Sequence, residues 1–358
     1  MNSTVINSGR KNRYDYIDYA KAVAIFLIGI GHFLPSGSFI RVALYSFHVP
    51  VFFFIAGYLY RFDPTTNFFN WLTNKVGRIL LPYFLFFALS LSVVFLQDGI
   101  QGIVDAISEN LFFVRGNMIW NTALWFLPVY FLCVVVFQLF NMAAKNSVLA
   151  VAILGVVCIA STAIIDTLNL HSFQILGLNK CICMLAFVCL GRIVRHHKLI
   201  DAVTGRRSSR SGTICMRAAF FVLLFCAGAI NTGDKISILD NDYNNIFLFL
   251  PFAMALSFTF VAMFITLKAS RLIRLISANT IFFLGTHLFF RFVYSSFFQM
   301  DTIAYVLFGV IVFVVYVMFF MFYDQLCKKH KMIANLGKYI GLFSLSNEHD
   351  TIARTAAM

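Results

Sequence analysis

Long apolar blocks recur along almost the whole chain and restrict it to a small set of folds. Each block runs for about 17–25 residues, the length that an α-helix needs to cross a hydrocarbon core of about 30 Å. Hydrophobic residues make up 60% of the sequence and charged residues only 12%, with a mean hydropathy of +0.83. Soluble domains carry about 25% charged residues. We therefore expect an all-α polytopic membrane protein without a soluble domain.

Polar and turn-rich segments divide the chain into about ten expected membrane-spanning helices. Their approximate ranges are 16–35, 45–61, 79–97, 123–142, 147–166, 178–194, 216–232, 244–267, 276–297 and 302–326. We expect one membrane-embedded domain, 1–358, with a core of about 14–330 and cytoplasmic tails at 1–13 and 331–358.

The basic residues favour one orientation of these spans. Successive connecting segments lie on alternate sides of the membrane. All but five of the 28 Lys and Arg residues fall in the segments on the same side as the amino terminus. Because cytoplasmic loops are enriched in Lys and Arg, we expect both termini to be cytoplasmic. The net charge of +13 is spread over short connecting segments, so membrane lipids are the expected electrostatic partners and nucleic acid is not.

Cysteine usage gives no sign of a metal site or a disulfide framework. The eight cysteines lie mostly inside apolar runs, and none of them forms a CxxC pair. Ligand cysteines in zinc sites and cysteines in disulfide-rich domains are spaced differently. We therefore expect packing roles for these side chains and no metal cofactor.

Ionisable side chains interrupt the first apolar block, "DYAKAVAIFLIGIGHF" (18–33). An ionisable residue within a span costs roughly 2.5–3.5 kcal/mol and is a functional-site hypothesis by default. Eleven residues separate Lys21 from His32, so a helix places them about 16 Å apart and within about 20° of one face. Structural roles stay open as well, because Lys21 can snorkel and pair with Asp18, and a neutral His32 can be hydrogen-bonded.

Further polar residues fall near the same two ends of the spans. His48 lies at a depth similar to that of His32, so the two histidines could share a site. At the expected cytoplasmic end of the spans, Lys75 and Arg78 form an i, i+3 pair. Such a pair alone would be an ordinary positive-inside feature. Late in the chain, Arg291 follows His287 by one helical turn; this pair could bind a substrate or could be a hydrogen-bonded structural pair.

Four segments together carry a family resemblance: "DYAKAVAIFLIGIGHF", "YSFHVPVFFFIAGYLY", "KVGRILLPYF" and "LWFLPVYFL". In this order, over roughly the first 135 residues, they resemble the acyltransferase-3 family of integral membrane acyltransferases. The most similar branch is that of the fucose 4-O-acetylase-like polysaccharide O-acetyltransferases. The later "ISANTIFFLGTHLFF" (276–290) resembles the Ser-containing span of that family, which ends in a histidine. Lys21 and Lys75 stand where many members have arginine, and lysine cannot make the same bidentate phosphate contacts; the branch named here has lysine at the first position.

The resemblance implies an O-acetyltransferase that takes acetyl groups from cytoplasmic acetyl-CoA. The acceptor would be a hydroxyl of an extracytoplasmic or lipid-linked glycan, and the membrane would be the bacterial cytoplasmic (inner) membrane. His32 would act as general base, with or without a transient acetyl-histidine; Trp125, Asn279 and His48 are candidate oxyanion donors. The expected site residues are, by role: catalytic, His32 and Asp18; coenzyme-binding, Lys21, Lys75 and Arg78; acceptor-binding, His48, Trp125, His287 and Arg291.

Two other functions are compatible with the same residues. In a transporter or flippase for a lipid-linked saccharide, the histidines and Lys21 would line a substrate or proton pathway and no coenzyme would be needed. A scaffold subunit of an envelope glycan complex would tolerate neutral replacement of His32. A homo-oligomer is compatible with all three functions.

Overall fold

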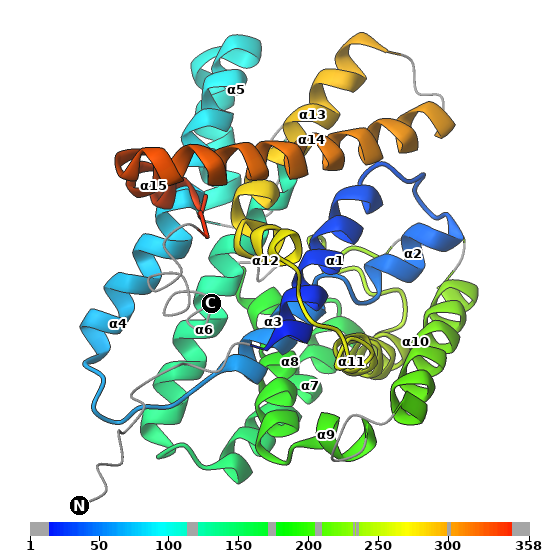
Figure 1. Cartoon of the computed structure of the whole chain (residues 1–358). Helices are drawn as coiled ribbons and strands as arrows, with labels where there is room; N and C mark the ends of the chain where they lie inside the picture. Colours follow the sequence, from blue (N-terminus) through cyan, green and yellow to red (C-terminus); the bar gives the residue numbers. More distant parts are fainter. Residues whose placement is uncertain are drawn as a thin grey trace, which may run out of the picture.

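The computed structural model of the chain is built from helices (Figure 1). It describes residues 14–112, 121–170, 177–204, 210–231, 233, 236–298 and 302–345. The elements are α1 (Asp15–Gly31), α2 (Phe39–Tyr45), α3 (Pro50–Leu59), α4 (Phe68–Lys75), η1 (Val76–Leu80), α5 (Leu81–Ile107), η2 (Ser108–Phe112), η3 (Thr122–Trp125), α6 (Phe126–Ala143), α7 (Val148–Thr167), α8 (Leu178–His196), α9 (Leu199–Thr204), α10 (Arg210–Asn231), α11 (Ile246–Ala262), α12 (Arg271–Ala278), α13 (Thr280–Phe297), α14 (Thr302–Lys329), α15 (Lys331–Gly337) and η6 (Lys338–Ile340).

The all-α membrane fold expected from the sequence is confirmed. Each of the ten expected ranges contains a helix. Within the described part of the chain six helices are long and apolar enough to cross a membrane, and a seventh span results if the bent pair α12–α13 counts as one. The first expected span, α1, has only 17 residues and carries Asp15, Asp18 and Lys21, so length and charge set it apart from those six.

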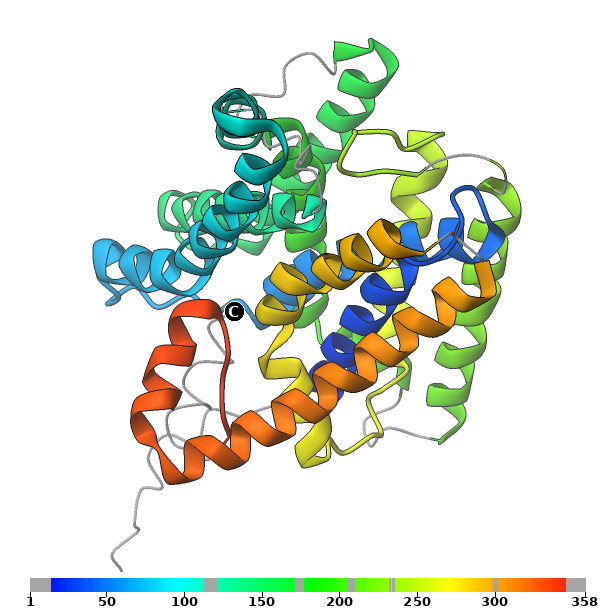
Figure 2. The ribbon, with the colours of Figure 1, turned by 90° about the horizontal axis from the view of Figure 1, so that it is seen from above.

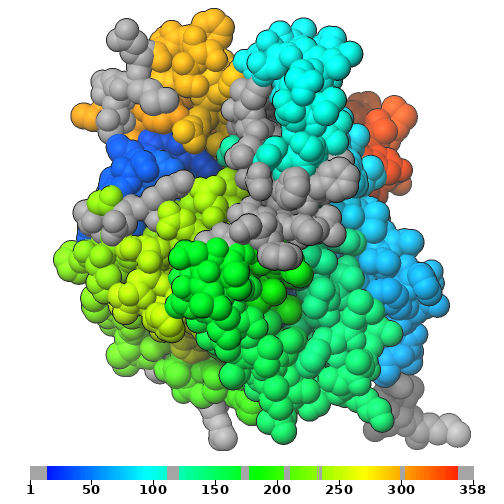
Figure 3. Space-filling view, turned by 180° about the vertical axis from the view of Figure 1, so that it is seen from behind, coloured from blue at the N-terminus to red at the C-terminus, as the bar shows by residue number. Residues whose placement is uncertain are grey.

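Helix α1 lies at the centre of the molecule. It contacts α2, α3, α11, α12, α13 and α14, and Figure 2 shows it enclosed between α13 and α14 on one side and the remaining helices on the other. The last turns of α5 and α13 project beyond the rest of the bundle on the same side (Figures 1 and 3). Because α1 is surrounded by these helices, none of its residues is exposed along its whole length.

Two expected spans are not regular single helices. The range 45–61 contains the end of α2, a turn that carries His48, and α3, although Phe39–Leu59 as a whole is one of the six long apolar helices. Pro50 begins α3 and has no backbone N–H, so one helical hydrogen bond is missing at this turn, while Val51 N–H still donates to the carbonyl of Phe47 at 3.0 Å. In the range 276–297, α12 and α13 meet at Asn279 and are bent by 74°.

Two other segments are more helical than expected. Helix α5 continues past the expected end at residue 97 to Ile107, with a break at Gly99, whose φ is +67°. At the other end of the chain, residues 331–345 fold back as α15, η6 and a short extension. The backbone of Phe343 there exchanges hydrogen bonds with the side chain of Asn279, at 2.6 and 3.0 Å. This part of the expected carboxy-terminal tail therefore packs against the bend between α12 and α13.

Candidate active site

His32 and His287 lie next to each other although 254 residues separate them along the chain. His32 is the C-cap of α1 and His287 lies in α13; their ring centroids are 5.2 Å apart. The Nδ1 atom of His287 lies 3.0 Å from the carbonyl oxygen of Phe283 and 3.1 Å from that of Leu284. Since a carbonyl only accepts, Nδ1 carries the proton there and Nε2 of the neutral ring is the acceptor. This buried Nε2 atom has no hydrogen-bond partner among the described residues.

Tyr45 connects His32 to His48. Its hydroxyl lies 3.3 Å from Nδ1 of His32, and its ring packs against that of His48 with 4.6 Å between centroids. His48 is buried, and its Nδ1 atom lies 2.6 Å from the carbonyl oxygen of Leu44. The guanidinium of Arg41 stands over the Tyr45 ring, 4.9 Å from its centroid. The turn that breaks the second expected span thus positions the groups around His32.

A cavity of about 200 Å³ opens onto this group; we call it the histidine cavity. Its wall contains His32, His48, Trp125 and Arg291, all of which the sequence analysis selected. His287 is fully buried beside His32 and does not itself line the cavity. The wall is completed by residues of α1, α2, the turn before α3, η3, the start of α6, α13 and the segment 236–240: Ile28, Arg41, Tyr45, Val49, Thr122, Ala123, Phe126, Ser237, Ile238, Leu239, Asp240 and Leu284.

A larger cavity, of about 570 Å³, lies beside α4 and η1; we call it the basic mouth. Lys75 and Arg78 both line it, together with Trp71, and the ammonium of Lys75 stands 5.7 Å from the centroid of a Trp71 ring. Asp63 lies in the same wall and is fully exposed. Hydrogen bonds from the Thr65 side chain and backbone hold the pKa of Asp63 below its ordinary value. The basic mouth therefore combines cations with one carboxylate that stays ionised.

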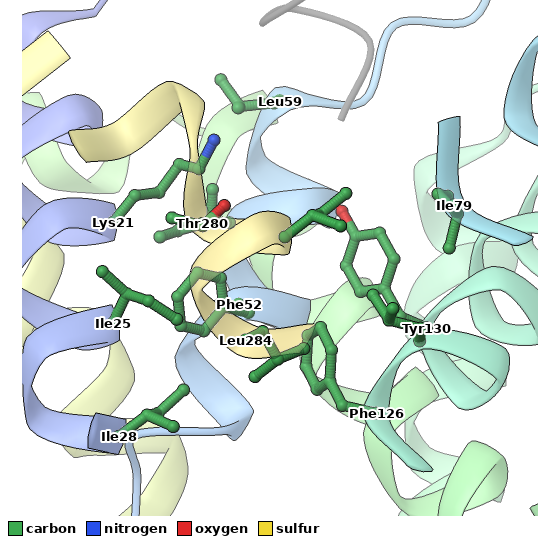
Figure 4. Close-up of a pocket in the computed structure, with 13 residues that line it drawn as sticks. Lys21, Ile25, Ile28, Phe52, Leu59, Ile79, Phe126, Tyr130, Thr280 and Leu284 are labelled. Carbon is green, nitrogen blue, oxygen red and sulfur yellow. The ribbon is translucent and has the colours of Figure 1, made fainter. Parts of the chain in front are cut away.

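A narrow apolar cavity of about 50 Å³ lies between the basic mouth and the histidine cavity. Its wall shares Leu59 with the basic mouth, and Ile28, Phe126 and Leu284 with the histidine cavity. Figure 4 shows Lys21 beside Leu59 at one end, with Ile28 and Phe126 at the other. The three cavities adjoin one another through these shared wall residues, and we call the three together the passage; Lys21 lines the narrow cavity and not the mouth.

Asp18 and Asn279 lie away from the histidine cavity. The Oδ1 atom of the buried Asp18 accepts a hydrogen bond of 2.7 Å from the hydroxyl of Ser277. Along α1, Asp18 is about 21 Å from His32. The side chain of Asn279 binds the carbonyl of Leu275 and the backbone of Phe343. Both residues tie α12 to its neighbours, and neither reaches the histidines.

Sequence reasoning did not select three residues that the structure brings to the site or its supports. Tyr45 and Arg41 belong to the histidine cavity, and Ser277 holds Asp18. A signal for the first two is present: Arg41, Tyr45 and His48 follow one another at helical spacings of four and three residues. No local signal links Ser277 to Asp18, because they meet only through packing of α12 on α1.

The fold and the cavities define a class: a helical membrane protein with a paired-histidine site, a basic mouth and a narrow apolar cavity between them. A family model described as an acyltransferase domain matches residues 14–322 of the chain. The protein therefore belongs to the acyltransferase-3 family and is a membrane acyltransferase. Neither the comparison with curated proteins nor the comparison with solved structures gave a match.

Proposed function

We propose that this acyltransferase moves an acetyl group from acetyl-CoA to a hydroxyl of an extracytoplasmic or lipid-linked glycan, as a member of the fucose 4-O-acetylase-like branch. The observation that supports this most strongly is the passage. It joins a basic mouth suited to a phosphate-rich carrier to a cavity that contains two adjacent histidines. An acyl donor and a hydroxyl acceptor can then reach the same point from opposite ends.

His32 is the proposed general base. A hydroxyl is a poor nucleophile at neutral pH, and a positioned base that removes its proton during attack contributes about 100- to 10,000-fold. The hydroxyl oxygen of Tyr45 lies within reach of Nδ1 of His32. With Nδ1–H donating to that oxygen, Nε2 is left to accept the proton of the acceptor hydroxyl. The new ester C–O bond forms as the thioester C–S bond breaks, and the proton passes from His32 to the leaving thiolate.

The basic mouth is the proposed coenzyme site. Coenzyme A carries several phosphates, and Lys75 and Arg78 supply cations in the wall of this cavity. The apolar narrow part excludes water from the thioester, which limits hydrolysis. In this arrangement Lys21 marks the point where the polar mouth gives way to the apolar wall.

The orientation follows from the same proposal. Acetyl-CoA is made in the cytoplasm, so the basic mouth faces the cytoplasm and the histidine cavity faces the opposite side of the bacterial inner membrane. Both chain termini are then cytoplasmic, in agreement with the distribution of Lys and Arg. Asp18 takes a positioning role in this account, because it holds Ser277 and lies far from the reacting atoms.

Release of coenzyme A from acetyl-CoA by the purified protein in nanodiscs, with native lipid-linked glycan added, tests this proposal. All eight cysteines are free, so a thiol reagent would also label the protein, and coenzyme A should be measured chromatographically. We expect His32→Ala to abolish release while still binding the coenzyme. The matched control is His197→Ala, which removes an exposed histidine and should leave release unchanged. If neither wild type nor variant consumes or binds the thioester, the proposal is wrong and transport of a glycan precursor becomes the better account.

A further inference from the structure

We propose that the acceptor carries an anionic group, a carboxylate or a phosphate, which binds between Arg41 and Arg291 in the histidine cavity. This inference rests on the proposed function and narrows the class of its acceptor. Two arginines line one cavity of about 200 Å³ together with His32. They come from α2 and α13 and stand 250 positions apart in the sequence, so only the fold brings them to the same wall.

Arg41 is held in place by contacts that leave its charge unneutralised. Its Nη1 atom donates a hydrogen bond of 2.8 Å to the carbonyl oxygen of Leu34, and its guanidinium stands over the ring of Tyr45. Guanidinium has five N–H donors in a fixed plane, so further donors stay available for a ligand. The side chain is ordered by neutral groups and is ready to bind an anion.

Arg291 is held in a similar way from the other side. Its Nε atom donates a hydrogen bond of 2.8 Å to the hydroxyl of Tyr305. The terminal Nη1 and Nη2 atoms are left as a fork, the geometry that matches a carboxylate or phosphate. Arg291 lies one turn after His287 in α13, so an anion bound to it would lie close to the paired histidines.

The charge balance of the cavity supports an anionic ligand. Among the described residues of the wall, Asp240 is the one carboxylate against the two arginines. It is exposed to solvent and accepts a hydrogen bond of 2.8 Å from the hydroxyl of Ser237. Among the described residues no carboxylate lies within ion-pair distance of Arg41 or Arg291, whereas Arg271 and Arg274 each have one. Both cavity arginines are partly buried, and cations withdrawn from water are stabilised by an opposite charge.

The position of the two arginines assigns the anion a role in orientation. Arg41 packs on the same Tyr45 whose hydroxyl meets Nδ1 of His32, and Arg291 lines the same cavity as His32. An anionic group bound there would direct a neighbouring hydroxyl of the same molecule toward His32. Fixing the reacting group in this way raises the rate without any chemical role for the anion.

Binding of two matched probes tests this inference: 4-nitrophenyl β-glucuronide, which carries a carboxylate, and 4-nitrophenyl β-glucoside, in which a CH₂OH group replaces it. Wild-type protein in nanodiscs should bind the glucuronide about tenfold more tightly, since charge-assisted hydrogen bonds are stronger than neutral ones. The preference should fall severalfold in Arg41→Gln and in Arg291→Gln, and should largely return in Arg41→Lys and Arg291→Lys. The control is Arg217→Gln, which removes an exposed arginine that also donates to a backbone carbonyl, that of Met263, and should keep the preference.

Glucose 1-phosphate distinguishes the two sources of the anion. If it binds in an arginine-dependent way and the glucuronide does not, the inference stands with phosphate as the group. The inference would be overturned if neither the glucuronide nor glucose 1-phosphate bound more tightly than the neutral glucoside, including the case in which none of the three binds. An unchanged preference in both glutamine variants would also overturn it. His32→Ala should keep the preference while losing transfer. Transfer to neutral glycans without any anion preference would contradict this inference and leave the proposed function intact.

Discussion

At the scale of single residues, Tyr45 is the group that most directly supports the proposed base. Its hydroxyl lies 3.3 Å from Nδ1 of His32. Among the described residues, no other side chain forms a hydrogen bond with that imidazole ring. Without this contact the imidazole can rotate or take the other tautomer. The proton-accepting nitrogen would then be the wrong one for part of the time.

We expect Tyr45→Phe to lower kcat by about 2- to 10-fold, the equivalent of one net hydrogen bond of roughly 0.5–1.5 kcal/mol, with KM for acetyl-CoA unchanged. Steady-state kinetics of coenzyme A release checks this. Tyr316→Phe is a matched control, because it removes a buried hydroxyl that donates to Thr286 at 2.6 Å outside the histidine cavity. A raised KM with unchanged kcat in Tyr45→Phe would show that Tyr45 contributes to binding and not to the base.

Residue spacing predicted part of this site and missed the rest for a physical reason. The eleven-residue interval from Lys21 to His32 places both on one helical face, and both side chains line the passage. The pairing of His32 with His287, in contrast, depends on how α13 packs on α1. Such a contact leaves no periodic pattern in either segment, so one sequence cannot reveal it.

At the scale of helices, α3 and α8 approach each other more closely than side chains would allow. A Cβ atom added at Gly57 would lie 1.8 Å from the carbonyl oxygen of Val188, and one at Gly191 would lie 2.0 Å from that of Phe54. Gly57 lies in α3 and Gly191 in its partner helix α8. Glycine is therefore required at both positions for backbone-to-backbone packing.

We expect Gly57→Ala and Gly191→Ala to destabilise the protein by about 1–3 kcal/mol or more, because the two helices must separate to accommodate the methyl group. Thermal unfolding in detergent, followed by fluorescence-detected size exclusion, measures this. Gly77→Ala is the control, since nothing lies within 4 Å of its added Cβ atom. Equal melting temperatures for all three variants would contradict the close packing of α3 on α8.

The bend between α12 and α13 depends on Asn279, whose amide holds Phe343 through two hydrogen bonds. In Asn279→Ala we expect the backbone amide of Phe343 to exchange with deuterium about 5- to 100-fold faster, as roughly 1–3 kcal/mol is lost when buried partners stay unpaired. Asn335→Ala, which removes an exposed asparagine that accepts from Lys338, should leave this exchange unchanged. An unaltered rate in Asn279→Ala would show that other contacts hold residues 338–345.

Hydropathy predicted that the spans are helices and where they approximately lie. It did not predict the bends and turns within those helices. An apolar run gives the same signal whether its helix is straight or bent, so the range 276–297 was expected to be one span. The chain near Phe343, some 60 residues later, supplies hydrogen-bond partners to Asn279 at the bend, and such a long-range contact leaves no local signal. Pro50, by contrast, is a local break signal.

At the scale of the whole molecule, the central claim is that one passage joins the basic mouth to the paired histidines. Each part is lined by several segments that are distant in the sequence. The mouth involves α3, α4, η1, α6 and α8; the narrow part α1, α3, η1, α6 and α13; and the histidine cavity α1, α2, η3, α6, α13 and the segment 236–240. The sequence predicted the membrane fold and both polar ends. The connection between them required the three-dimensional arrangement.

The most direct test of this claim is to obstruct the narrow part without touching either end's charged groups. Leu284 and Ile28 line both the narrow cavity and the histidine cavity, so Leu284→Trp and Ile28→Phe would fill their junction. Phe289→Trp enlarges an exposed side chain in the same helix, α13, and serves as the control. Binding of desulfo-CoA, a coenzyme analogue without the thiol, reports whether the basic mouth is still folded.

The measurement is coenzyme A release from acetyl-CoA in these variants beside desulfo-CoA affinity. We expect Leu284→Trp and Ile28→Phe to bind desulfo-CoA as wild type does, while releasing coenzyme A about 100-fold more slowly, because the thioester no longer reaches His32. Phe289→Trp should match wild type in both. Wild-type release by a variant whose narrow part is filled would contradict the account, since the acyl group would then reach its acceptor by another route.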